Sequence, residues 1–200
     1  MVVGPDGVGK TSVARALCDS PDVAARYFHF RPLVWTALLS RPPDTEVAPP
    51  SKGSPTGSRT LGWVRVARNF VRFWVGYVVR VKPATKRGQL VVGDRWAYGY
   101  LTQPFMLKFY GPRWLAAALI RWLPEPDVVI NLVAAPEVIF SRKQELSQAQ
   151  IGNELTAWAQ LPVPGLQDYD ASQARDAIAR DVIADLVARR LGSEEGSNPQ

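Results

Sequence analysis

Apolar positions along the chain follow two spacings in turn, and this alternation predicts the order of its strands and helices. Short apolar runs, typical of buried strands, occupy residues 1–3, 27–30, 88–94, 126–134 and 165–170. Helical spacing is found within residues 11–19, 61–81, 98–109, 113–123, 137–147 and 173–191. Strands that alternate with helices indicate an α/β fold of three layers, with a mostly parallel central sheet flanked by helices.

We expect a single domain over residues 1–191. Residues 40–60 are rich in Pro, Gly, Ser and Thr, which predicts a long mobile loop. It is not a linker between domains, because neither side holds a complete core. Residues 192–200 are expected to form a disordered tail. The first strand is short for one that precedes a glycine-rich loop, which favours a native start upstream of Met1.

Composition narrows the range of functions. Of 200 residues, 46% are hydrophobic and 21% charged, so the chain can bury a core. The chain has one cysteine, which excludes an internal disulfide framework, and one histidine. Together they are too few for a zinc site made of cysteine and histidine ligands. Neither a secretion signal nor an apolar stretch of membrane-spanning length is evident, so we expect a cytoplasmic protein.

The net charge of +6 is unevenly distributed. No acidic residue lies between Glu46 and Asp94, whereas nine Lys or Arg residues do. This part of the chain should attract anions such as phosphates, nucleic acid or an anionic membrane.

The segment GPDGVGKT, residues 4–11, fits the pattern G-x-x-x-x-G-K-[ST] of a P-loop between a strand and a helix. Its glycines allow backbone N–H groups to surround phosphate oxygens, and the helix N-terminus faces the same anion. Lys10 would reach the β- and γ-phosphates, and the Thr11 hydroxyl would bind Mg²⁺. We therefore expect a P-loop NTPase fold in which ATP and Mg²⁺ are bound by Gly4, Pro5, Asp6, Gly7, Val8, Gly9, Lys10, Thr11 and Ser12.

Asp94 ends the predicted strand at 88–94, where P-loop proteins place an acid that helps to hold Mg²⁺. An aspartate after a strand can equally cap the next helix. The two roles are compatible.

Together, GPDGVGKT, GDRW and PDVVINLVAAPEVIFSRKQE resemble the thymidylate-kinase-like group of P-loop nucleoside monophosphate kinases. With FHFRP, the chain also resembles thymidylate-kinase-like proteins associated with bacterial surface-polysaccharide genes. The resemblance implies that Asp94 serves the metal and that Arg95 binds the acceptor phosphate. It also implies that Asp6 contacts the acceptor sugar. Arg31 lies where the family places another phosphate-binding arginine, although a plain surface arginine fits equally well.

Departures from the family pattern change the expected acceptor and the source of catalytic charge. Val8 stands where some members carry an arginine that stabilises the transferring phosphoryl group. We expect Arg142, or else Lys143, to supply this positive charge. Both side chains could instead be solvated at a helix end. Residues 144–174 contain no Lys or Arg, which predicts a reduced lid over about 142–160. Gly99 and the segment Thr102-Gln103-Pro104 replace the base-reading residues, so thymidine monophosphate is not the expected acceptor.

Two aromatic clusters have alternative interpretations. Trp96, with neighbouring aromatics, could line the acceptor pocket or belong to the core. The basic aromatic helix at 61–81 could be a core helix, a membrane-surface helix or, less favoured, a nucleic-acid-binding helix. Kinases of the family that the chain resembles often form homodimers, but the sequence leaves the oligomeric state open.

The sequence as a whole predicts an ATP- and Mg²⁺-dependent phosphotransferase acting on a small phosphorylated or hydroxyl-bearing acceptor. The catalytic residues would be Lys10, Asp94, Arg95 and Arg142. Asp6, Arg31, Arg95 and Trp96 would bind the acceptor. The alternative is a nucleotide-binding accessory or regulatory protein with little catalysis, linked to surface-polysaccharide assembly.

Overall fold

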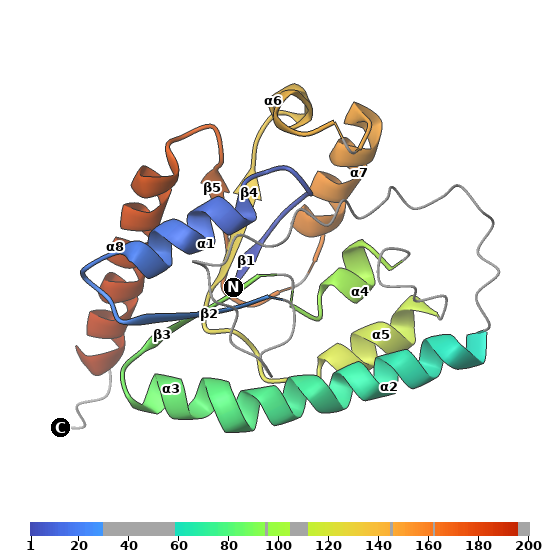
Figure 1. Ribbon diagram of the computed structural model, residues 1–200, viewed down its shortest axis with the longest axis horizontal. Coiled ribbons are helices and arrows are strands. Elements are labelled where there is room, and N and C mark those ends of the chain that lie inside the picture. The colour runs from blue at the N-terminus through green and yellow to red at the C-terminus, as the bar shows by residue number, and fades with distance from the viewer. Residues whose placement is uncertain (30–58, 95, 105–111, 145, 162, 196–200) are drawn as a thin grey trace.

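A computed structural model describes residues 1–29, 59–94, 96–104, 112–144, 146–161 and 163–195 (Figure 1). The side chains of residues 59–63, 65 and 190–195 are outside this description. The expected loop from residue 40 to 58 and the last five residues of the expected tail also lie outside it, as do Arg31 and Arg95.

Five parallel strands form the central sheet, in the order β2-β3-β1-β4-β5. Their bounds are β1 Val2–Val3, β2 Ala25–His29, β3 Leu90–Asp94, β4 Val129–Val133 and β5 Leu166–Asp170. The predicted α/β class with a mostly parallel sheet is confirmed. After β1 the chain crosses to the edge strand β2, returns through β3 beside β1, and then continues on the other side through β4 and β5. The carboxyl ends of β1, β3 and β4 are therefore adjacent at the point where the chain changes from one side of β1 to the other. In open α/β sheets this is the usual ligand position.

Along the chain each strand is followed by one or more helices, and these helices cover both faces of the sheet (Figure 1). Their bounds are α1 Lys10–Asp19, α2 Arg59–Gly76, the π-helical turn η1 Tyr77–Val81, α3 Lys82–Lys86, α4 Gly99–Thr102, α5 Arg113–Ile120, α6 Pro136–Arg142, α7 Gln148–Ala159 and α8 Arg175–Glu195.

Alternation along the strands divides the core between the two faces of the sheet, because successive strand side chains point to opposite faces. Val2 and Ile130 pack with residues of α1 and α8 on one face. Val3 and Val129 pack with residues of α2, α4 and α5 on the other. The α7 helix contributes to both clusters, through Ile151 on the first and Trp158 on the second.

Three sequence expectations need correction. The helix expected from 137 to 147 ends at Arg142, and a separate helix, α7, occupies most of the segment expected as a reduced lid. The helix expected within 98–109 is the single turn Gly99–Thr102 in its described part. The closing helix continues to Glu195, so residues 192–195 are helical rather than part of a disordered tail.

The start of α7 has a clear local cause. The Ser147 hydroxyl accepts the backbone N–H of Gln150, and the Gln150 side chain accepts the N–H of Ser147, which forms a capping box. Ile151 and Trp158, both buried, then anchor the helix to the core at helical spacing.

Candidate functional site

Backbone geometry shapes the glycine-rich loop between β1 and α1. Gly4 has a φ of 132°, and a Cβ atom there would lie 2.7 Å from the carbonyl oxygen of Leu132 on β4. Gly9 caps α1 with a φ of 107°, in the left-handed region that glycine adopts without strain. No side chain forms a capping hydrogen bond to the N–H groups in the first turn of α1. This end of the helix is therefore suited to an anion.

Lys10 is the buried cation of the loop. Its ammonium donates to the carbonyl oxygens of Gly4 at 3.1 Å and Pro5 at 2.7 Å, and forms an ion pair with Asp6 Oδ1 at 3.2 Å. The loop thus holds its lysine side chain folded back along its own backbone. The next two side chains, Thr11 and Ser12, are exposed at the first turn of α1, where they are accessible to a ligand of the loop.

Asp94 lies at the carboxyl end of β3, next to β1 and the loop. Its backbone is paired with Val2 on one side and His29 on the other. The side chain is 1% exposed, and its Oδ2 accepts the Tyr27 hydroxyl at 3.5 Å and lies 3.4 Å from Nδ1 of His29. Its Oδ1 is buried and has no hydrogen-bond partner within the described part of the chain. A buried carboxylate oxygen in this state is a natural ligand for a cation.

These residues fit Mg²⁺ bound together with a nucleotide better than a metal held by protein alone. Among the described residues, no group of three or more His, Cys, Asp or Glu could hold a metal ion. Mg²⁺, however, is usually bound by one or two protein oxygens together with substrate phosphates and water. Asp94 and Thr11 supply the carboxylate and hydroxyl oxygens for such a site.

Arg142, at the end of α6, contacts the loop through its guanidinium group. Its guanidinium donates to the carbonyl oxygen of Ala171 at 2.9 Å and to that of Val8 at 3.5 Å. Lys143 follows directly, and a Cβ added to Gly7 would lie 3.1 Å from the Cβ of Lys143. Both cations expected from the sequence therefore lie beside the loop. Arg142 also connects the loop to the segment between β5 and α8.

Glu154 of α7 joins the loop and was not among the residues singled out from the sequence. The backbone N–H of Asp6 donates to Glu154 Oε2 at 3.4 Å. Burial raises the pKa of the Glu154 carboxyl, the Asp6 carboxylate raises it further, and the nearby Gln103 side chain partly offsets both effects. Two carboxyl groups, Asp6 and Glu154, thus lie together at one end of the loop.

His29 was also missed, although its position follows from strand pairing. It ends β2 opposite Asp94, and its side chain is about half exposed. The only sequence signal was its place within FHFRP, directly after an apolar run.

Trp96, for which the sequence leaves a pocket and a core interpretation open, is buried among aromatic side chains. It is 4% exposed and makes edge contacts with Phe28, at a ring separation of 6.0 Å, and with Phe73, at 4.7 Å. Its packing favours the core interpretation over acceptor binding. Arg95 and Arg31, the other residues expected at the acceptor, lie outside the described residues.

No protein-family model and no curated protein sequence matches this chain. Among solved structures, it is similar to the YorR protein from Bacillus subtilis, determined in complex with phosphorylated GDP. The two chains are 17% identical, the match covers 94% of this chain and 95% of that one, and the TM-score is 0.51. This similarity shows a shared fold, in agreement with the P-loop NTPase-like architecture expected from the sequence.

Proposed function

We propose that this chain is an ATP- and Mg²⁺-dependent phosphotransferase of the thymidylate-kinase-like type. Its acceptor would be a small phosphorylated or hydroxyl-bearing molecule other than thymidine monophosphate. The observation that carries the proposal is the pairing of a phosphate-binding loop around buried Lys10 with buried Asp94 on the adjacent strand.

Each residue would contribute a distinct interaction. The loop N–H groups and Lys10 bind the nucleotide phosphates, and Lys10 exchanges its carbonyl partners for phosphate oxygens. Thr11 and Asp94 would hold Mg²⁺, which when bound neutralises charge on the phosphate oxygens. Arg142 is close enough to the loop, through Val8, to stabilise charge on the phosphoryl group in transfer.

The similar fold of YorR supports nucleotide binding, because that protein was determined with phosphorylated GDP. The carboxyl groups of Asp6 and Glu154 support an acceptor with hydroxyl groups, since a carboxylate accepts hydrogen bonds from hydroxyls. Arg95 would bind an acceptor phosphate by a bidentate contact, as the sequence resemblance implies.

The proposal is tested by nucleotide turnover with a panel of nucleoside monophosphates, nucleosides and sugars, read as ADP release. We expect at least one acceptor to stimulate ADP release, and Lys10→Ala to reduce that rate by at least about 100-fold. Lys10→Met retains most of the side-chain volume and should be equally inactive. The exposed Lys86→Ala on α3 is the matched control and should remain active. Normal turnover by folded Lys10→Ala protein would refute the mechanism.

A nucleotide-binding accessory protein with little catalysis is the second candidate. The observation in its favour is that α7 contains no basic residue, nor does any position from 144 to 174. Calorimetric ATP binding without ADP release for any acceptor would favour this candidate. Stimulation of ADP release by an acceptor would exclude it.

A further inference from the structure

The outward side of α2 and η1 is apolar, which is unusual for a helix at a protein surface. The inward side, with Val66 and Phe73, packs in the core. The outward side carries exposed apolar residues whose exposed fractions range from 38% to 64%: Val64, Val71, Trp74, Val75, Val78 and Val79. From Val71 onward these positions recur every three or four residues, and Val64 lies two turns before Val71, so they form one stripe along the helix.

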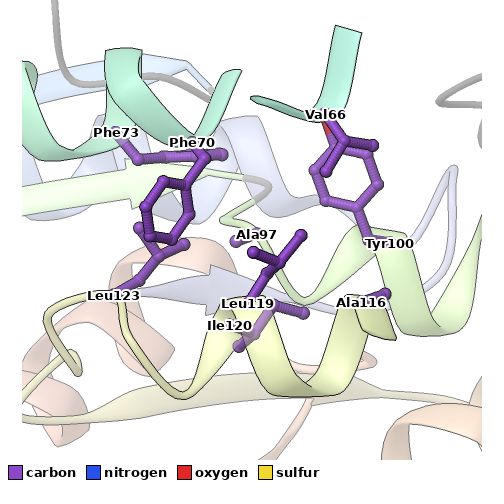
Figure 2. A pocket seen from close by; sticks show the side chains of 9 residues that line it. All are labelled: Val66, Phe70, Phe73, Ala97, Tyr100, Ala116, Leu119, Ile120 and Leu123. Atoms are coloured by element: carbon purple, nitrogen blue, oxygen red, sulfur yellow. The ribbon is translucent and has the colours of Figure 1, made fainter. Parts of the chain in front are cut away.

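Apolar surface next to this stripe extends from α2 to α5. The two helices face each other in Figure 2, where Val66 and Phe70 of α2 point toward Leu119 and Ile120 of α5. Beside this contact runs an apolar groove of about 400 Å³. It is lined by Val66, Ala67, Phe70, Val71, Leu115 and Leu119. Trp114 and Trp122, near the two ends of α5, are 70% and 74% exposed.

The described charged side chains of α2, η1, α3 and α5 are all basic. Between Glu46 and Glu125 the sequence holds thirteen Lys or Arg residues and a single acid, Asp94, which is buried. The described basic side chains that are exposed on α2, η1, α3 and around α5 are Arg68, Arg80, Lys82, Lys86, Arg87, Arg113 and Arg121. An exposed apolar stripe bordered by uniformly positive charge complements an anionic, amphipathic partner.

We propose that the face formed by α2, η1, α3 and α5, here called the basic apolar face, binds an anionic lipid surface. Valines and tryptophans would enter the interface between headgroups and acyl chains, while the arginines and lysines contact anionic headgroups. No helix in the described part of the chain is long and apolar enough to cross a bilayer, so this contact would be peripheral.

Two other partners fit the observations less well. In a symmetric dimer the same patch meets itself, and the described charged side chains of α2, η1, α3 and α5, which are all basic, would then bring like charges together. Nucleic acid would match the charge, but an outward row of valines offers neither hydrogen bonds to phosphate nor stacking to bases.

Co-sedimentation of the purified full chain with vesicles tests the proposal. We compare vesicles of phosphatidylcholine alone with vesicles that also contain phosphatidylglycerol. Binding is expected to the anionic vesicles only, and to weaken strongly at about 1 M salt, where the screening length falls to about 3 Å.

Matched variants locate the contact. Val78 and Val187 are similarly exposed, at 53% and 51%, but Val187 lies on α8, on the opposite side of the sheet. Val78→Glu should weaken vesicle binding about tenfold or more, whereas Val187→Glu should leave it unchanged. Arg80→Glu should weaken binding by at least about fivefold, and the exposed Arg180→Glu on α8 should have no effect.

Several results would overturn the proposal. One is equal binding to neutral and anionic vesicles, and another is equal loss of binding in Val78→Glu and Val187→Glu. A dimer in sedimentation analysis that Val78→Glu dissociates, without vesicle binding, would assign the face to a second copy. Salt-sensitive binding to DNA without vesicle binding would assign it to nucleic acid. The readout is independent of nucleotide turnover, so its failure leaves the proposed function untouched.

Discussion

Single residues at the carboxyl edge of the sheet determine the chemistry available there. Asp94 is buried, and the polar groups within reach of its Oδ2, Tyr27 and His29, both come from β2. Lys10 and Asp6 neutralise each other within the loop. This pairing lowers the cost of burying the charges of Lys10 and Asp6.

Glu154 provides a pH-dependent test at this scale. Its pKa in the folded chain is raised, chiefly by burial, above the unfolded value of about 4.3. Between these two pKa values the folded state binds more protons than the unfolded state, so the free energy of unfolding falls as pH rises through that window. Glu154→Gln removes this titration. We expect the variant to gain stability relative to the wild type as pH rises from 4 to 7.

Urea unfolding at several pH values measures this difference. Asp181→Asn, a change of the same type at an exposed position of α8, serves as a comparison. A stability difference between Glu154→Gln and wild type that stays constant across this pH range would contradict the expected titration.

At the scale of elements, α7 depends on its first turn. Ser147→Ala removes one half of the capping box, which should destabilise the chain by about 1 kcal/mol. Thermal unfolding should show the melting temperature falling by about 2–4 °C. Ser141→Ala on α6 is the control, because that exposed hydroxyl bonds only to the Val138 carbonyl within its own helix. Equal shifts in both variants would contradict a specific role of the cap.

Most elements were predictable, because buried strands and amphipathic helices leave local patterns in the sequence. The helix α7 was missed although Ser147 and Gln150 have capping-box spacing and Ile151 and Trp158 follow at helical spacing. Because residues 144–174 contain no Lys or Arg, the sequence favoured a reduced lid over a helix in this segment. The sequence pattern also could not show which apolar side chains of α2 would stay exposed, because only packing determines which side of a helix is covered.

The loop was predictable from local spacing, but two of its neighbours were not. Glu154 contacts Asp6 across 148 residues, and no local motif marks such a contact. His29 reaches Asp94 through the register of β2 on β3, which depends on the pairing of two distant strands. Trp96 looked the same in sequence whether it lined a pocket or the core; its contacts with Phe28 and Phe73 favour the core.

For the whole molecule, the proposed nucleotide binding predicts a change in thermal stability. A ligand that binds only the folded state at a concentration 100 times its Kd adds about 2.7 kcal/mol. For a chain of this size the melting temperature should rise by about 5–10 °C with ATP and Mg²⁺. ATP without Mg²⁺ should give a smaller rise, and Lys10→Ala protein almost none. Equal shifts in wild-type and Lys10→Ala protein would refute binding through the loop.

The division of the core by the sheet also has a consequence for orientation. Val8 of the loop packs with α1 and α8, whereas α2 and α5 pack on the opposite face, as the two sides of Figure 1 show. If the basic apolar face binds a bilayer, the sheet would lie between that bilayer and the layer of α1 and α8, which contains Val8. Nucleotide would then approach the carboxyl edge of the sheet from bulk water, while the core layer formed by α2 and α5 would lie toward the bilayer.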